Sequence, residues 1–172
     1  VFPKRWDYTT ERIDGFPIIV TSHRETSPFT LSVTQGEPAP VVSYSYDRET
    51  ITPYSYEVTV ADGDIDVEFA VSHQSAIYRI DFLKDAPSVL ILNSANGVMD
   101  VDGNVITGTQ VIQDKTTVYV YMETSQTPVE TGYLNPSCVT MTFDEKTLDV
   151  RYGVSFISVE KEKKNLRREI KD

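Results

Sequence analysis

From residue 41 onward, apolar and polar side chains of this chain alternate one by one over several short runs. In the first run, Val42, Tyr44 and Tyr46 are each followed by a polar residue. Successive side chains of a β-strand point to opposite faces, so this pattern is typical of a strand with one buried face. The alternation recurs over residues 56–61 and 65–70. Between these two runs, Asp62-Gly63-Asp64 predicts a tight hairpin turn, because Asp and Gly tolerate the positive φ angles of such turns.

Further strands are predicted along the rest of the chain. Residues 88–92 form an apolar run without alternation, which indicates a central strand buried on both faces. A second hairpin is predicted at Asp102-Gly103. The remaining predicted strands are residues 77–82, 98–101, 105–107, 116–123, 138–143 and 148–157. Nine or ten short strands separated by turns predict an all-β fold, an antiparallel β-sandwich.

The two ends of the chain differ from this pattern. Residues 1–40 are irregular, and their one short apolar run, residues 16–20, predicts a strand with Pro17 near its start or at a sheet edge. Ser158 is predicted to cap a helix over residues 159–172, whose only apolar stripe is Leu166 and Ile170. We therefore expect a sandwich domain over residues 1–157. Residues 158–172 are expected to begin a linker helix whose apolar stripe contacts a further domain. No Gly or Pro that would terminate a helix follows, so we expect the helix to continue beyond residue 172.

Composition excludes several classes of partner. The chain has 172 residues and a formal net charge of −10, which repels phosphate backbones, so nucleic acid is not an expected partner. The sequence has neither an apolar run long enough to span a bilayer nor a basic amphipathic stretch that would recruit it to an anionic membrane. Cys138 is the single cysteine, so no disulfide within the chain is possible, and we expect it to be a small core residue.

The common catalytic constellations are not evident in the sequence. Neither His23 nor His73 lies in a nucleophile motif, and two histidines with one cysteine make a zinc site improbable. Residues 100–104 resemble the start of a calcium loop, but the Gly and Glu that such a loop requires are replaced by Val105 and Val111. The acidic residues lie in turns or on the polar side of strand patterns, so no desolvated carboxylate pair for glycoside chemistry is indicated.

A cluster near the start of the chain is the one candidate for ligand binding. Trp6 and Tyr8 could stack on the apolar face of a sugar ring, and His23 and Arg24 could donate hydrogen bonds to its hydroxyl groups. The structural alternative is that Trp6 closes one end of the sandwich.

Several blocks of the sequence resemble the N-terminal domain of the glycoside hydrolase family 92 exo-α-mannosidases. The most specific block runs from residue 148 to 169, where a family strand V-G-I-S-x-V-S leads into a helix E-x-A-x-x-N-L-x-x-E. Two further blocks are similar in the same order, namely residues 46–82 and 8–16. The residues that match the first block are Gly153, Ser155, Ser158, Glu160, Asn165, Leu166 and Glu169.

The resemblance implies a galactose-mutarotase-like supersandwich, which in the family packs on a following (α/α)6 barrel. That barrel carries most calcium ligands and the catalytic acid and base, so neither a catalytic residue nor a metal site is expected in this chain. The resemblance also implies a secreted, periplasmic or cell-surface α-mannosidase that acts on mannose-containing glycans. This chain is expected to shape one wall of the sugar pocket and to be inactive alone. The alternative is a freestanding carbohydrate-binding or cell-surface interaction module.

Overall fold

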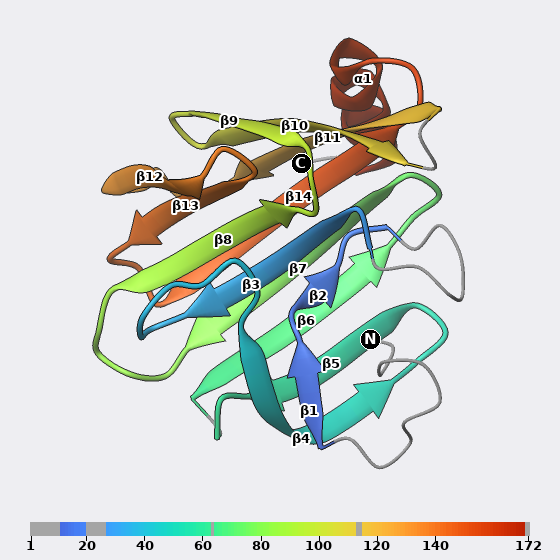
Figure 1. Ribbon diagram of the computed structural model, residues 1–172. Helices are drawn as coiled ribbons and strands as arrows, with labels where there is room; N and C mark the ends of the chain where they lie inside the picture. Colours follow the sequence, from blue (N-terminus) through green and yellow to red (C-terminus); the bar gives the residue numbers. More distant parts are fainter. Residues whose placement is uncertain (1–10, 20–26, 63, 113–114, 171–172) are drawn as a thin grey trace.

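The computed structural model describes residues 11–19, 27–62, 64–112 and 115–170, which form two antiparallel β-sheets and one helix (Figure 1). The larger sheet has nine strands in the order β1 (Arg12–Asp14), β4 (Ser43–Ile51), β5 (Ser55–Val60), β6 (Ile65–Val71), β7 (Ser75–Phe82), β14 (Thr147–Ser155), β11 (Thr116–Thr124), β10 (Val105–Ile112) and β9 (Val98–Asp102). The smaller sheet has five strands in the order β12 (Glu130–Asn135), β13 (Cys138–Phe143), β8 (Ser88–Ser94), β3 (Phe29–Thr34) and β2 (Phe16–Pro17). Helix α1 (Val159–Glu169) follows β14. The predicted all-β antiparallel sandwich with a C-terminal helix is confirmed.

The central strand predicted at residues 88–92 is β8, the third of five strands in the smaller sheet. Leu90, Ile91 and Leu92 are all fully buried, which explains why the sequence does not alternate there. Both hairpins are also confirmed. β5 pairs with β6 from Val60↔Ile65, and β9 pairs with β10 from Asp102↔Val105.

A chain crossing at Gly15 connects the two sheets. β1 belongs to the larger sheet and β2 to the smaller one, and Gly15 between them has a φ of +63°. A Cβ atom at Gly15 would lie 2.5 Å from the side chain of Thr30, so the position requires glycine on both grounds. Of the described residues 16–19, only Phe16 and Pro17 pair with β3, so this part of the strand predicted over residues 16–20 is shorter than expected. Pro17 lies in an edge strand, as predicted.

Buried tyrosines join the two layers of the core. Tyr44 of β4 donates a hydrogen bond to the Val33 carbonyl (2.6 Å) and accepts one from the Val33 N–H (2.7 Å), which ties the larger sheet to β3. Tyr152 of β14 donates to the Ile18 carbonyl (3.1 Å). Both hydroxyl groups are therefore satisfied although their side chains are buried. Desolvation by burial raises the pKa of both tyrosines above the ordinary value.

Helix α1 begins as predicted, but Leu166 is buried against this domain and is not left for another one. Ser158 is the N-cap, and its hydroxyl accepts the N–H of Lys161 (3.3 Å). Leu166 is 1% exposed, and α1 packs against β14, β11 and β7 of its own domain. The expectation that Leu166 is reserved for a further domain is therefore wrong. The described helix ends at Glu169, and residues 171–172 lie outside the described residues. None of the helices that the structure describes is long and apolar enough to cross a membrane.

Candidate functional site

The two ends of the larger sheet differ in chemistry. One end carries the β4–β5 and β6–β7 turns and the segment after β14, at the right of Figure 1. The exposed apolar side chains at this end are spread along the sheet from β4 to β10: Ile51, Tyr54, Val71, Val111, Phe156 and Ile157. We call this the apolar end.

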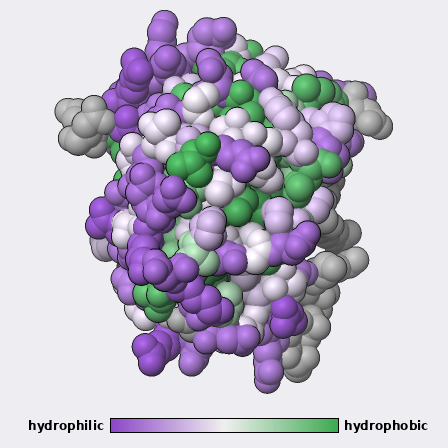
Figure 2. All heavy atoms as spheres, turned by 90° about the vertical axis from the view of Figure 1, so that its left-hand side faces the viewer, coloured by the Kyte–Doolittle hydropathy of each residue, from purple (hydrophilic) through white to green (hydrophobic). Residues whose placement is uncertain are grey.

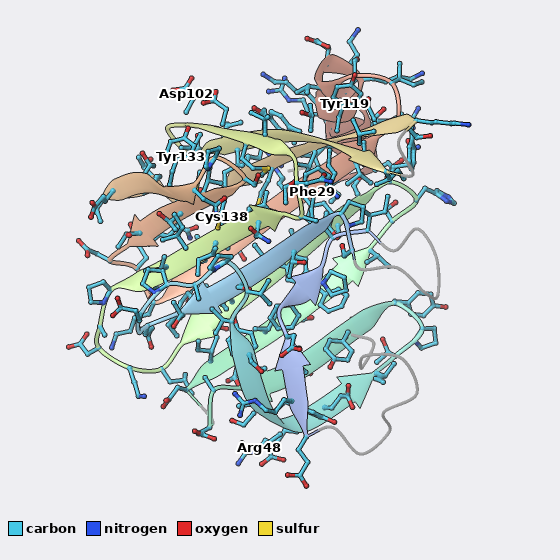
Figure 3. All side chains as sticks on the ribbon, in the orientation of Figure 1. Phe29, Arg48, Asp102, Tyr119, Tyr133 and Cys138 are labelled. Carbon is cyan, nitrogen blue, oxygen red and sulfur yellow. The ribbon has the colours of Figure 1, made fainter. Side chains whose placement is uncertain are left out.

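The opposite end carries mainly charged turns, and we call it the charged end. Figure 2 looks onto it, and hydrophilic side chains dominate that face, with apolar ones scattered singly. Its turns contain six acidic residues and two lysines, namely Asp62, Asp64, Asp85, Asp102, Asp144, Glu145, Lys84 and Lys146. Asp102 belongs to the residues that resemble a calcium loop, and it points away from the body of the protein at the β9–β10 turn (Figure 3).

A cavity of about 320 Å³ lies at the apolar end. Half of its lining comes from residues 71–75 at the β6–β7 turn, including the exposed His73. The rest comes from Ile18, Ile19, Tyr152, Val154 and Phe156. Six of the ten lining residues carry apolar or aromatic side chains, and the other four, residues 72–75, are polar, so the lining is mixed.

The chain leaves and re-enters the described structure beside this cavity. Ile18 and Ile19 line it, and Ser27 donates a hydrogen bond to the Ile19 carbonyl (2.7 Å). The Ile18 N–H also donates to the Phe29 carbonyl (3.0 Å). The predicted sugar-binding residues Trp6, Tyr8, His23 and Arg24 all lie outside the described residues. Their role stays a prediction, and so does their proximity to one another.

Glu169, at the end of α1, is bonded to the turn that lines the cavity. Its carboxylate accepts hydrogen bonds from the Ser75 hydroxyl (2.6 Å) and the Gln74 N–H (3.1 Å). Only 10% of the Glu169 side chain is exposed. Sequence reasoning placed Glu169 in a family block without a role, and it missed residues 71–75. The sequence signal for this end of the sheet is the family block, whose matches Gly153, Ser155, Ser158 and Glu169 lie at the end of β14 and in the segment and helix that follow it.

The protonation of Glu169 should therefore affect stability. Desolvation is the largest single influence and raises its pKa, but hydrogen bonds from Ser75, Gln74, Ser72 and Arg168 together outweigh it. The pKa of Glu169 consequently lies below its ordinary value of 4.5. A lowered carboxyl pKa adds stability that is complete above the unfolded value and is lost as the pH falls through the folded value.

We expect Glu169→Gln to lower the free energy of unfolding at pH 7 and the difference from the wild type to shrink as the pH falls below about 4.5. Urea unfolding at a series of pH values would measure this, with Glu145→Gln in the exposed β13–β14 turn as the control. A difference that grows toward acid pH would contradict the expectation.

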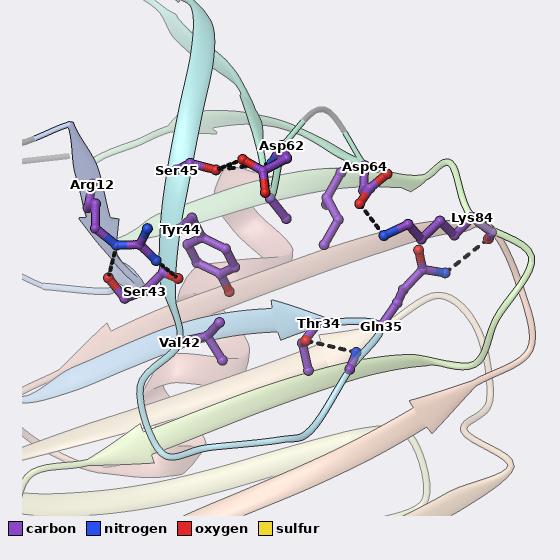
Figure 4. Close-up of a pocket in the computed structure, with 13 residues that line it drawn as sticks. Arg12, Thr34, Gln35, Val42, Ser43, Tyr44, Ser45, Asp62, Asp64 and Lys84 are labelled. Carbon is purple, nitrogen blue, oxygen red and sulfur yellow. Dashed lines mark hydrogen bonds and ion pairs between the residues drawn. The ribbon is translucent and has the colours of Figure 1, made fainter.

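A second hollow, of about 360 Å³, opens at the charged end (Figure 4). Its charged groups have partners within the lining, two of them serines. Arg12 donates to the Ser43 hydroxyl and carbonyl (3.0 and 2.8 Å), Asp62 accepts from Ser45 (2.6 Å), and Asp64 pairs with Lys84. Tyr44, the only aromatic residue in its lining, is 2% exposed and offers no face for stacking on a sugar. We therefore regard the cavity at the apolar end as the candidate site.

The described residues provide little for catalysis. No Asp or Glu whose burial is described is fully buried, and hydrogen bonds lower the pKa of the largely enclosed Glu169, whereas a general acid requires a raised pKa. Cys138 is buried in β13, as predicted, and burial raises the pKa of its thiol to about 11, which disfavours the nucleophilic thiolate. The described part of the chain also contains no group of three or more His, Cys, Asp or Glu residues that could hold a metal ion.

Solved enzymes share this fold. The structure is similar to a family GH92 inverting mannosidase from Bacteroides thetaiotaomicron, with a TM-score of 0.73 and 22% identity over 84% of this chain and 24% of that chain. It is also similar to a family GH92 α-mannosidase from the same organism, with a TM-score of 0.80 and 14% identity over 94% and 29% of the two chains. For the GH92 family glycosyl hydrolase ccman5, the TM-score is 0.75 and the identity 16% over 96% and 29%. This chain thus spans about a quarter of the length of these relatives.

The two antiparallel sheets with one C-terminal helix define the chain by fold as a β-sandwich domain. No curated protein sequence shows a significant match to the chain. The sequence model described as "Glycosyl hydrolase family 92 N-terminal domain" matches residues 3–165. The chain belongs to this family, and the resemblance stated from its motifs is confirmed.

Proposed function

We propose that this chain is the non-catalytic N-terminal domain of a secreted, calcium-dependent α-mannosidase, and that its apolar end forms one wall of the sugar pocket. Its partners are the enzyme's own C-terminal (α/α)6 barrel and a mannose-containing glycan. The observation that carries the proposal is the coincidence, at one end of the larger sheet, of a cavity, of exposed apolar side chains and of the end of α1.

The difference between the two ends supports this orientation. Contact between two domains removes apolar surface from water, which is favourable, whereas burying unpaired charge is costly. Phe156 and Ile157 are 50% and 62% exposed in the segment that leads into α1. A neighbouring domain seated on the apolar end would cover them and enclose the cavity.

Calcium does not fit the described residues of this chain. The ion takes six to eight oxygen ligands gathered in one place, and the described residues contain no cluster of metal-ligating side chains. In the proposed enzyme, the barrel supplies the calcium ligands together with the catalytic acid and base. A secreted, periplasmic or cell-surface location follows from the proposed glycan substrate.

Matched substitutions in the full-length enzyme test the proposal. We expect Phe156→Ser and Ile157→Ser at the apolar end each to lower kcat/KM for an α-mannoside about 10-fold or more, because buried anchors of an interface contribute about 2 kcal/mol or more. The controls are Leu83→Ser and Val129→Ser at the charged end, which are similarly exposed at 56% and 60% and should change little.

Chelation of calcium should abolish the activity, and adding the ion back should restore it. Equal effects at the two ends would contradict the proposed wall. Absence of calcium-dependent α-mannosidase activity, together with glycan binding by this chain alone, would favour a freestanding carbohydrate-binding module instead.

A further inference from the structure

Three residues of the larger sheet form a row beneath helix α1. The strand register places Tyr121 of β11 opposite Gly153 of β14, and Gly153 opposite Ser75 of β7. Neighbouring strands lie about 4.8 Å apart, so the row from Tyr121 to Ser75 is about 9.6 Å long. These three residues belong to the face of the sheet that is turned away from the core, because their neighbours along each strand, such as Val120, Tyr152 and Ala76, belong to the core.

The helix matches this row in length and in contacts. Six residues of helix rise about 9 Å, and residues six apart in α1 contact the two ends of the row. Lys163 Nζ lies 5.8 Å from the centre of the Tyr121 ring, and Glu169 is bonded to Ser75. Leu166 lies halfway between Lys163 and Glu169 on the helix, and it is buried. Gly153 is likewise the middle residue of the row. α1 therefore crosses the strands, in agreement with its contacts to β11, β14 and β7.

The C-terminal end of α1, where it reaches β7, holds the β6–β7 turn in position. Glu169 holds the turn from the helix side through the Gln74 N–H and the Ser75 hydroxyl. The sheet holds it from the other side, because the Val154 N–H donates to the Gln74 carbonyl (2.9 Å), and the Ser72 N–H donates to the Ser75 carbonyl (2.7 Å) to close the turn. This turn supplies five of the ten residues that line the cavity at the apolar end.

We propose that Glu169 is a positioning residue for the sugar pocket, because it fixes the β6–β7 turn, with His73, against the end of α1. It touches neither the cavity nor a reacting atom and acts only through the turn. The inference deepens the proposed function and rests on it for its kinetic consequence, whereas its structural consequence can be measured in this chain alone.

The structural measurement uses hydrogen exchange of the 172-residue chain. Glu169→Ala should accelerate exchange of the amides of residues 72–75 at least about 10-fold, which corresponds to the loss of hydrogen bonds to a charged group. Amides of β8 should be unaffected. Lys164→Ala, at an exposed position of the same helix, is the control. Unchanged exchange at residues 72–75 would overturn the proposal, whatever the activity of the full-length enzyme.

The kinetic measurement uses the full-length enzyme. Glu169→Ala should lower kcat/KM for an α-mannoside about 10-fold, mainly through a higher KM, because a misplaced wall weakens binding. Ser75→Ala should act in the same direction, and the double variant should be no worse than Glu169→Ala, because both break one contact. Glu169→Gln, which retains an acceptor oxygen, should recover part of the loss.

A merely structural role would reduce the amount of folded enzyme and leave KM unchanged. That result, with normal activity of the wild type, would overturn the positioning role and leave the proposed function intact. A wild type without α-mannosidase activity would instead refute the proposed function, and the exchange measurement would still decide whether Glu169 holds the turn.

Discussion

The 172-residue chain by itself should leave α-mannosides intact, with or without calcium. Inverting hydrolysis requires a protonated acid and an ionised base about 6.5–9.5 Å apart on opposite sides of the glycosidic bond. No Asp or Glu with described burial is buried, and no metal-ligating cluster occurs among the described residues. A missing general acid or base alone typically costs about 10²–10⁴ in rate. In the proposed enzyme another domain supplies the acid, the base and the calcium, so we expect no turnover above the buffer blank from this chain alone.

The assay would incubate the purified chain with several α-mannosides and calcium and follow release of mannose. The full-length enzyme at the same molar concentration is the positive control, and the same preparation passed through a second purification step excludes a contaminating hydrolase. Turnover that persists at constant specific activity through the second step would show that the active site lies in this chain.

Leu166→Ala should release α1 from the domain. Leu166 is 1% exposed beneath the helix, and removal of a buried leucine side chain typically costs about 2–5 kcal/mol. Leucine and alanine have similar helix propensities, so the loss concerns packing. An 11-residue helix is marginal in water without tertiary contacts. We therefore expect α1 to unfold locally while both sheets remain folded.

Hydrogen exchange would report this as loss of protection over residues 159–169 with unchanged protection of β8. Lys164→Ala, an exposed position of the same helix, should leave both regions as in the wild type. Retained protection of α1 in Leu166→Ala would mean that Lys163, Glu169 and the cap at Ser158 suffice to hold the helix.

Local patterns of the sequence are sufficient to predict an element whose structure depends only on its own residues. The unbroken apolar run at residues 88–92 can only be buried on both faces, and β8 is the middle strand of its sheet. Asp62-Gly63-Asp64 and Asp102-Gly103 can reverse the chain at low cost, and hairpins lie at both places. Ser158 has a hydroxyl that can satisfy a free N–H of the first helical turn, and it does so.

The packing of Leu166 cannot be predicted from such local patterns. Its spacing indicates a buried face but does not say what covers that face. α1 packs on β14, β11 and β7, and strand register sets Tyr121, Gly153 and Ser75 side by side on those strands from three separate parts of the chain. A surface assembled in this way is not visible in the sequence around residue 166, so the spacing alone does not show that Leu166 packs on its own domain.

The sequence by itself determined the all-β class, the central strand, the hairpins, the helix cap and the family, because each depends on the period or the order of neighbouring residues. The tertiary structure alone decided which end of the larger sheet is apolar, that residues 71–75 line a cavity there, and that Glu169 holds this turn from nearly a hundred residues away. These features depend on strand order and register, which result from packing two sheets into one core, and that packing involves the whole chain at once.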